Sequence, residues 1–281
     1  MTDQIDIAHL RSWIGREEEA TDVVGAELVR RFAATLDLEP ASAGPGSPAP
    51  ALIHLCLAPP VVPTCATGPD GHPARGGFLP PVPLPRRMWA GGAFTFHRDI
   101  RVGERVLRRS RIGEVAVKEG RTGLLCFVTV EHRISVEGEL VVTERQDIVY
   151  RDAGGAPSAV PEPAPAGEVR KHVAPTPLLL FRYSALTFNG HRIHYDHPYA
   201  TGVEGYPGLV VHGPMQATML LHHAAAIGGR TPSRFSFRSL SPLFDDADFT
   251  LNAVEDGEGI RLWTAREGGP VAMSAQAWWQ A

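Results

Sequence analysis

A short motif that occurs twice, about half a chain apart, constrains this sequence more than any other feature. Residues 94–98 read FTFHR, and residues 235–238 read FSFR. Each copy is followed by a turn that leads into a strand-like run, beginning near Val102 in the first half and near Phe244 in the second. A chain of 281 residues suits two domains of about 130 residues better than one small domain. The repeat therefore predicts two related units in tandem.

Alternation of apolar and polar residues follows each copy of the motif. In the run LLCFVTVEHRISV, the side chains expected on one face are Val128, Val130, His132, Ile134 and Val136. Period-two alternation interrupted by glycine-rich turns is typical of antiparallel strands with one buried face. The strands predicted in this way cover residues 105–117, 124–136 and 139–150 in the first half and 249–254, 260–265 and 271–279 in the second.

One helix is predicted in each half. Residues 21–36 have an apolar position every fourth residue, and Thr21 or Asp22 could cap this helix. Residues 213–227 begin with Gly-Pro, end before Gly228 and are apolar on nearly every side, so this helix should be buried. A buried helix wrapped by a twisted antiparallel sheet is a hot-dog unit. The expected fold class is therefore α+β, with two tandem hot-dog units.

Two segments rich in proline and glycine divide the chain. Residues 151–170 contain few large apolar side chains and are interpreted as a linker. This gives an N-terminal unit of residues 1–150 and a C-terminal unit of residues 171–281. The other segment, residues 58–92, is too long for a simple connection, and loops of that length are often functional.

Composition and charge exclude several functional classes. The formal net charge of −4 argues against a nucleic-acid-binding protein, which usually has a basic excess. The sequence has no run of about 18 apolar residues and no secretory pattern at its start, so we expect no membrane-spanning helix and no export. Cys56, Cys65 and Cys126 lack zinc-site spacing, and Cys126 should be a buried free thiol. So few cysteines indicate a reducing compartment, and we expect a cytoplasmic protein.

The densest group of chemically capable side chains lies just before the second helix. It comprises Arg182, Tyr183, Asn189, His191, Arg192, His194, Tyr195 and Asp196. The segment resembles the signature of MaoC-like, R-specific enoyl-CoA hydratases, in which an Asp is followed five residues later by a catalytic His. Here Asn189 stands at the Asp position and His194 at the His position.

Other stretches extend this resemblance to both halves. The sequences NGHRIHYD from Asn189, GLVVHGP from Gly208 and GGFLPPVPLPRRMWAGG from Gly76 look most like the mesaconyl-C4-CoA (3-methylfumaryl-CoA) hydratase branch and its relatives, the mitochondrial-type 3-hydroxyacyl-thioester dehydratases. The resemblance implies a hydro-lyase that adds water to an enoyl-CoA thioester or removes it, with mesaconyl-C4-CoA to citramalyl-CoA as the leading reaction. No metal or cofactor is expected, because coenzyme A is part of the substrate.

Hydration of an enoyl-thioester needs a base for water, a proton for the α-carbon and donors for the enolate oxygen. A neutral histidine can remove the proton from water and return it, and we assign this role to His194. Asn189 cannot be a base, but its amide can hold the attacking water. Either His194 shuttles the proton alone, or Asp196 supports it on the same face of an extended segment. The backbone N–H of Gly213, at the helix start, is expected to meet the thioester oxygen.

A second group of residues is assigned to substrate binding. These residues are Arg192, His191, Tyr195, Arg86, Arg87 and Trp89. Arg192 and His191 are the cations expected to meet a carboxylate on the acyl group. The residues from the first half would meet the nucleotide end of coenzyme A or shape the acyl tunnel. Because the first half has no copy of the Asn-to-His pattern, we expect it to be a non-catalytic wall of that tunnel. Exposed sheet edges could still pair two copies into a homodimer.

Several alternatives stay open at this point. A 3-hydroxyacyl-thioester dehydratase of fatty acyl chains, an itaconyl-CoA hydratase and a non-catalytic acyl-CoA-binding protein would each keep the same fold. Thioester hydrolysis also occurs on hot-dog folds, but it usually needs an acidic base where this chain has Asn189. His194 could be a core histidine, and His191, His212 and the His222-His223 pair could be structural.

Overall fold

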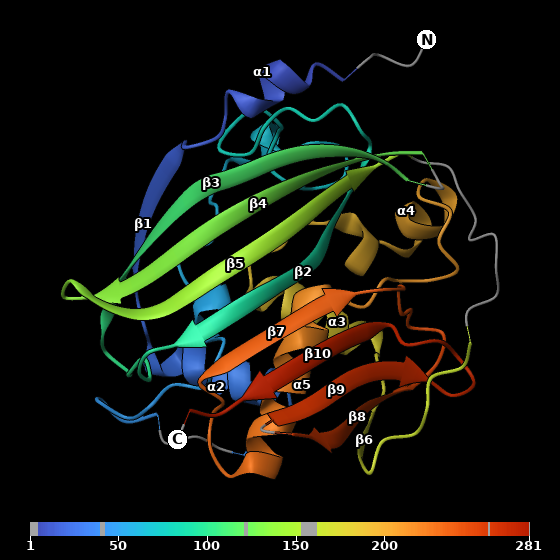
Figure 1. Ribbon diagram of the computed structural model, residues 1–281. Helices are drawn as coiled ribbons and strands as arrows, with labels where there is room; N and C mark the ends of the chain where they lie inside the picture. Colours follow the sequence, from blue (N-terminus) through green and yellow to red (C-terminus); the bar gives the residue numbers. More distant parts are fainter. Residues whose placement is uncertain (1–4, 40–42, 121–122, 153–161, 258, 281) are drawn as a thin grey trace.

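The structure is a computed structural model that describes residues 5–39, 43–120, 123–152, 162–257 and 259–280. Among these residues, one antiparallel sheet of ten strands has the order β1-β3-β4-β5-β2-β7-β10-β9-β8-β6 (Figure 1). The strands of the first half are β1 (Glu17–Val23), β2 (Arg86–Phe96), β3 (Arg105–Gly120), β4 (Gly123–Val136) and β5 (Glu139–Arg151). Those of the second half are β6 (Val169–Val173), β7 (Arg234–Ser239), β8 (Phe249–Asp256), β9 (Gly259–Arg266) and β10 (Met273–Trp278). The predicted α+β fold of two tandem hot-dog units is confirmed.

The two copies of the repeated motif meet at the centre of the sheet. β2 pairs with β7, and Phe94 lies directly opposite Phe235. The ring of Phe94 stacks against Phe235 and Phe237, with centroids 6.4 and 6.1 Å apart. All three rings are buried, so the repeat forms an apolar seam that joins the two halves into one continuous sheet.

The second half wraps around α5 (Gly213–Gly228), which contacts β7, β8, β9 and β10. Every side chain from Met215 to Leu221 is buried. Gly229 ends the helix with a φ of +71°, a left-handed conformation that glycine adopts without steric cost. The prediction of a buried helix in this half is confirmed.

The first half has no counterpart of α5 among the described residues. Its longest described helix, α2 (Ala26–Thr35), packs against α3 (Pro177–Leu186) of the second half. One part of the inner face of β3, β4 and β5 is covered by Leu10 of α1 (Ile7–Arg11) and by Val82 and Leu84 of a loop. The other part belongs to the main core cluster, together with Val29 and Phe32 of α2. The two halves therefore share a sheet but not the element that fills it.

The helix predicted at residues 21–36 begins later than expected, at Ala26. The preceding residues form β1, because their backbone pairs with β3 at the edge of the sheet. Asp22 does not cap the helix, since its carboxylate accepts hydrogen bonds from the backbone N–H groups of Val23 and Ala58. The helical periodicity of the sequence could not reveal this long-range strand pairing.

The burial pattern of β4 matches the predicted alternation. The residues expected on its inner face are buried, and Glu131 and Arg133 between them are exposed. Cys126, also on β4, is a buried free thiol, as predicted. No helix in the described part of the chain is long and apolar enough to cross a bilayer.

Part of the predicted linker, residues 153–161, lies outside the described residues. The stretch that follows is attached to the second half, since Gly167 N–H donates to Asn252 Oδ1. Trp263 Nε1 also donates to the carbonyl of Pro165. Residues 165–167 of the predicted linker are therefore packed onto β8 and β9.

The other proline- and glycine-rich segment, residues 58–92, runs from the first half across to the second. It contains a short 3-10 helix, η2 (Thr64–Ala66), and ends in β2. The remaining short elements are η1 (Ile53–Cys56), η3 (Arg192–His194) and α4 (His197–Gly202). The last two lie where this segment contacts the second half, and they carry the site described next.

Candidate active site

His194 lies buried at the end of η3, 7 % exposed. Its Nδ1 is 2.7 Å from the carbonyl oxygen of Val210, so Nδ1 carries the hydrogen and donates it. Nε2 is then the nitrogen with a free lone pair. Burial lowers the pKa of His194 to about 4, so the ring is neutral at pH 7. The side chain can therefore accept a proton at Nε2.

The ring of His194 stacks on His212, with centroids 3.7 Å apart and planes 19° apart. His212 directly precedes α5, and its Nε2 lies 2.8 Å from Ser184 Oγ. Burial also lowers the pKa of His212 well below its usual value, so the two stacked rings are both neutral. The stack fixes His194 beside the N-terminus of α5.

The N-terminus of α5 is uncapped. The side chain of the N-cap residue, His212, makes no hydrogen bond to the first N–H groups of the helix. Among the described residues, no group accepts a hydrogen bond from the N–H of Gly213. The first N–H groups of a helix carry partial positive charge and bind anions. The start of α5 can therefore hold the oxygen of an enolate, next to a neutral base.

Asn189 shapes the loop that carries these histidines. Its Oδ1 accepts a hydrogen bond from the backbone N–H of His191, at 3.0 Å. Because this bond uses the amide oxygen, the Asn189 NH2 group is the part left to contact a ligand.

Asp196 does not pair with His194 in the structure. The segment is not extended, because residues 192–194 form η3 and Asp196 begins α4 as its N-cap. Its carboxylate binds Arg192, 2.7 Å from Nη2, and accepts a hydrogen bond from Tyr199 N–H. The hydrogen bond from Arg192 lowers the pKa of Asp196. Asp196 is thus a helix cap and the counter-ion of an arginine.

The arginines assigned to substrate binding differ in their partners. Arg192 is bound to Asp196 and stacks over the ring of Tyr199, 4.1 Å from its centroid. Arg86 is paired with Glu204, 3.4 Å away, and bonds to its carbonyl oxygen. Arg87 has no carboxylate within 4 Å among the described residues.

Two aromatic residues assigned to the substrate have structural contacts. The hydroxyl of Tyr195 donates to the carbonyl of Gly190, and the side chain is 45 % exposed. Trp89 Nε1 donates to the carbonyl of Gly91, and the ring packs edge-on against Phe237. The backbone carbonyl of Trp89 lies near Gly213, which brings the first half to the start of α5.

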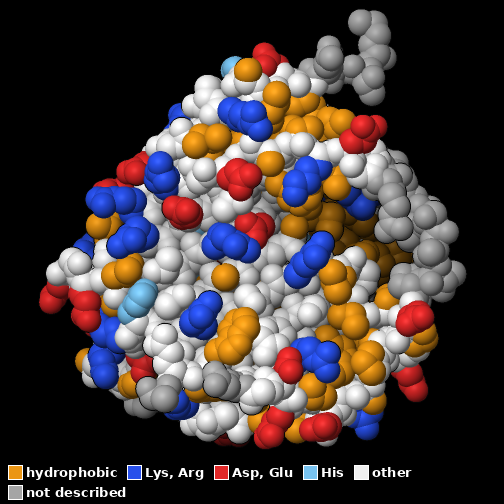
Figure 2. Space-filling model, in the orientation of Figure 1, with side chains coloured by type: hydrophobic (Ala, Val, Ile, Leu, Met, Phe, Trp, Pro, Cys, Tyr) orange, Lys and Arg blue, Asp and Glu red, His pale blue; other side chains and the backbone are white. Residues whose placement is uncertain are grey.

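A small pocket opens beside this site, between the halves of the molecule. Its lining residues are Asp70, Pro85, Arg86, Arg87, His191, Ile193, Glu204 and Tyr206. The surface is hollowed on the side of the molecule where α4 lies (Figure 2). The pocket combines an arginine-rich strand of the first half with the histidine loop of the second.

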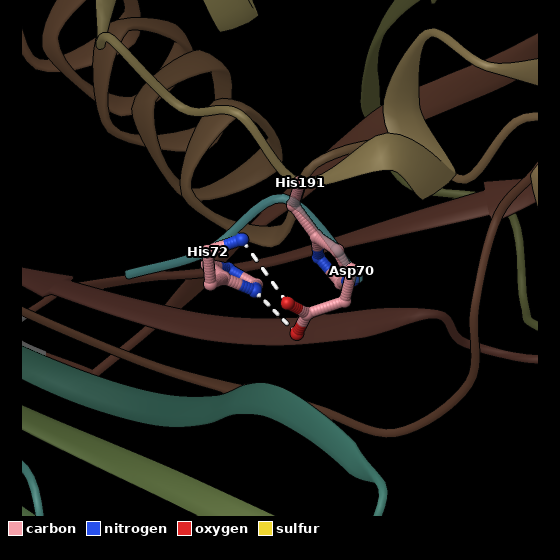
Figure 3. Close-up of side chains that lie close together, drawn as sticks. All are labelled: Asp70, His72 and His191. Carbon is pink, nitrogen blue, oxygen red and sulfur yellow. Dashed lines mark hydrogen bonds and ion pairs between the residues drawn. The ribbon is translucent and has the colours of Figure 1, made fainter. Parts of the chain in front are cut away.

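Sequence reasoning missed two residues of this region, Asp70 and His72. They lie in the long segment 58–92, and their side chains are directed toward His191 (Figure 3). His72 Nδ1 is 3.0 Å from Asp70 Oδ2, and the ring centroids of His72 and His191 are 4.1 Å apart. The signal available in the sequence was the length of the segment together with its Asp-Gly-His triplet.

Asp70, His72 and His191 are also the described residues whose donor atoms could share a metal ion, since these atoms lie within 4.8 Å of one another. Burial lowers the pKa values of His191 and His72, so both imidazoles are neutral. Burial raises the pKa of Asp70, but hydrogen bonds from His72 outweigh it and lower the pKa overall. This charge distribution suits either a cation or a hydrogen-bonded Asp–His pair.

Comparison with known proteins places the chain in a family. Residues 52–245 match the family model of hydroxyacyl-thioester dehydratase type 2. Mesaconyl-C(4)-CoA hydratase of Chloroflexus aurantiacus is 46 % identical over 94 % of this chain and 95 % of that protein. The matched region includes both the segment 58–92 and the histidine loop.

Solved structures agree on the fold. HtdX of Mycobacterium tuberculosis superposes with a TM-score of 0.67 at 21 % identity, covering 94 % of this chain and all of that one. Another M. tuberculosis protein, described as a double hot-dog fold, gives a TM-score of 0.57 at 13 % identity and covers 94 % and 95 % of the two chains. The chain therefore belongs to the hydroxyacyl-thioester dehydratase type 2 family and is a hydro-lyase built on a double hot-dog fold.

Proposed function

We propose that this protein hydrates an enoyl-CoA thioester, with mesaconyl-C4-CoA to citramalyl-CoA as its leading reaction. The observation that carries the proposal is a buried, neutral His194 with a free Nε2, fixed by a stacked ring beside the uncapped start of α5. A base and an enolate-binding helix N-terminus in contact are what hydration of an activated double bond requires. The 46 % identity to a mesaconyl-C(4)-CoA hydratase supports the choice of substrate.

In this mechanism His194 Nε2 removes a proton from water while the water oxygen bonds to the β-carbon. The electrons of the double bond move to the thioester oxygen, and the N–H of Gly213 stabilises the enolate. The imidazolium of His194 then delivers its proton to the α-carbon and becomes neutral again. The Asn189 NH2 group donates a hydrogen bond to the oxygen of the attacking water. No further cofactor takes part.

The acyl carboxylate needs a cation, and we assign it to Arg87 rather than Arg192. Arg192 already neutralises Asp196, and Arg86 neutralises Glu204. Arg87 lines the pocket next to His191 and has no described carboxylate partner. A guanidinium that has no carboxylate partner in a half-buried pocket can bind a carboxylate through two parallel hydrogen bonds.

The test is a panel of mesaconyl-C4-CoA, itaconyl-CoA and crotonyl-CoA, followed by loss of the conjugated-thioester absorbance. We expect the fastest turnover with mesaconyl-C4-CoA. His194→Ala should lower kcat by at least about 10²-fold, whereas the matched control His97→Ala, at an exposed position, should not. Turnover of His194→Ala near the wild-type rate would remove His194 from the mechanism.

Dehydration of 3-hydroxyacyl chains of fatty acids is the second candidate, because the matching family is named for the dehydration of hydroxyacyl thioesters. The charged lining of the pocket disfavours a long alkyl chain there, since burying alkyl groups beside unpaired charge is costly. A rate on crotonyl-CoA that exceeds the rate on mesaconyl-C4-CoA would favour this second candidate.

Two finer points belong to the same proposal. We place the protein in the cytoplasm, on the basis of its sparse cysteines and intracellular type of substrate. We also propose a homodimer through the edge strands β1 and β6, which each pair with one neighbour only in the described sheet. Light scattering at several protein concentrations tests the assembly.

A further inference from the structure

The long segment of the first half is attached to the histidine loop of the second half through its backbone. The N–H of Arg192 donates to the carbonyl of Asp70 at 2.9 Å, and Arg192 Nη1 donates to the carbonyl of Pro69. Gly71 and Gly190 touch so closely that a Cβ on Gly71 would overlap the carbonyl oxygen of Gly190. Because the segments meet without side chains between them, the residues on either side of Gly71 are held at fixed positions against this loop.

Three side chains that can bind a metal ion converge across this contact (Figure 3). Asp70 and His72 come from the first half and His191 from the second, and one donor atom of each lies within 4.8 Å of the other two. His72 Nδ1 is 3.0 Å from Asp70 Oδ2. Two ligands of one zinc ion lie about 3.3 Å apart, because the bonds are about 2.0–2.1 Å long and meet at a tetrahedral angle. Asp70 and His72 are therefore already near ligand spacing, and a small shift of His191 completes the set.

The backbone holds each of these side chains in place. Asp70 Oδ1 accepts the backbone N–H of His72 at 3.1 Å, which leaves Oδ2 to face the imidazole. The N–H of Gly68 donates to the carbonyl of His72 at 2.7 Å and closes this turn. In the second half, Asn189 Oδ1 accepts the N–H of His191 at 3.0 Å. Ligands that are fixed before the ion arrives lose little conformational freedom when they bind it.

The donor atoms indicate the class of ion. Two imidazole nitrogens and one carboxylate oxygen suit zinc and other late first-row divalent metals, whereas calcium and magnesium take oxygen ligands. Three protein ligands leave a fourth position of a tetrahedral ion open. Asp70 and His191 also line the small pocket between the halves, so this position faces the pocket and can be filled by water.

Arg87 is the neighbouring charge that opposes a cation here, since it lines the same pocket without a described carboxylate partner. The other two arginines of this region are engaged. Arg86 is paired with Glu204, and Arg75 donates to backbone carbonyls within residues 82–85. A zinc-type ion is bound through two imidazole nitrogens, so it loses less from this charge than calcium or magnesium, which rely on carboxylates.

We propose that Asp70, His72 and His191 form a site for one divalent transition-metal ion, with zinc as its occupant. The ion joins the segment 58–92 to the histidine loop. It takes the place of the hydrogen between His72 Nδ1 and Asp70, and the neutral ring then carries its hydrogen at Nε2. The ion lies outside the proton transfers assigned to His194, so this inference is independent of the proposed hydratase function.

The metal content of untagged protein, purified without a chelator, tests the site directly. We expect about one equivalent of zinc per chain by plasma mass spectrometry. The Tm should rise by about 5 °C when excess zinc is returned to chelator-treated protein. His72→Leu and Asp70→Asn should each lose the retained zinc and the shift in Tm. His97→Leu, at an exposed position, is the matched control and should keep both.

Two results of these measurements would overturn the proposal. One is a Tm of chelator-treated wild type that zinc, cobalt, nickel and manganese all leave unchanged. The other is zinc retained equally by the wild type and by His72→Leu, which would be an adventitious ion only.

The tautomer of His72 gives a second readout, in wild-type protein, that does not depend on the folding of a variant. ¹⁵N NMR of histidine-labelled protein at pH 7 should show Nδ1–H before zinc is added, because Asp70 accepts this hydrogen. It should show Nε2–H and a metal-bound Nδ1 in excess zinc, and magnesium should change nothing. An Nδ1–H that persists in excess zinc would contradict the proposal. None of these measurements uses turnover, so a failure of the hydratase function is detected separately.

Discussion

The two halves of this protein contribute equal numbers of described strands to one sheet, yet only one of them contains a central helix. In the second half, α5 fills the sheet and presents an uncapped N-terminus beside His194. In the first half, the short helices α1 and α2 and loop residues cover the inner face, and the long segment 58–92 contacts the second half. The repeat therefore preserves the sheet, while the two halves contribute different residues. The second half contains His194, and the first half supplies Arg86 and Arg87 to the pocket lining.

Buried histidines offer the sharpest contrast between the halves. His194 keeps a free Nε2, whereas His132 in β4 has both nitrogens engaged, with Ser110 Oγ at 2.8 Å and Gln146 Oε1 at 3.3 Å. We expect His194→Ala to lower kcat by at least about 10²-fold. It should also lose stability, because the carbonyl of Val210 loses its hydrogen bond. His132→Ala should keep kcat and lose about 1–3 kcal/mol in the free energy of unfolding, because buried partners lose a hydrogen bond. Steady-state kinetics and urea unfolding on both variants measure this contrast, which would disappear if both lost activity equally.

Core packing should also differ between the halves. Leu220 is fully buried in α5, so Leu220→Ala should cost about 2–5 kcal/mol of stability. Leu10 belongs to the five-residue helix α1. This short helix can move toward the sheet and fill the space left by the shorter side chain, so Leu10→Ala should lower the free energy of unfolding by less. Chemical denaturation gives both values. A larger loss at Leu10 would show that α1 is as essential to the first half as α5 is to the second.

The pH dependence of stability should come mostly from the second half. Burial lowers the pKa values of His194 and His222 to about 4, below the value of about 6.5 in an unfolded chain. Below pH 6.5 the unfolded state binds protons that these folded residues do not, so the stabilising contribution is complete above pH 6.5 and is lost as the pH falls toward 4. Each residue contributes about 1.4 kcal/mol per pH unit over that range. A double variant, His194→Gln with His222→Gln, should flatten the curve, and an unchanged slope would contradict this assignment.

The smallest expected effect separates the two arginines of the substrate pocket. Arg87→Ala should raise KM for mesaconyl-C4-CoA by about 10-fold and leave crotonyl-CoA unaffected, since one charge-assisted contact is worth about 1.5–3 kcal/mol. Arg192→Ala should change both substrates alike, because Arg192 pairs with Asp196 and anchors the loop. Equal losses for Arg87→Ala on both substrates would assign Arg87 to coenzyme A instead of the acyl carboxylate.

Prediction from sequence succeeded where the signal was local. The alternation in β4, the turn glycines and the apolar run at 213–227 each depend on residues that are close together in the sequence. The structure contains the strand, the turns and the helix that they predict. β1 (Glu17–Val23) was missed because its backbone pairs with β3, a pairing that no local pattern encodes, and the predicted helix overlapped it at residues 21–23. The resemblance drew attention to the histidine loop, and the structure places His191 and Ile193 at the pocket and His194 beside the start of α5.

The sequence by itself determined the two-unit α+β fold, the buried helix of the second half and the loop that contains His194. These features could be predicted because alternation, capping residues and motif spacing involve residues that are close together in the chain. Only the tertiary structure decided that Asp196 binds Arg192 and that Arg87 lines the pocket without a described carboxylate partner. It also decided that Asp70 reaches this pocket from the other half and that His72 contacts His191. The physical reason is that ion pairing and pocket geometry depend on which distant segments touch. Here a contact between Gly71 and Gly190, far apart in the chain, brings them together.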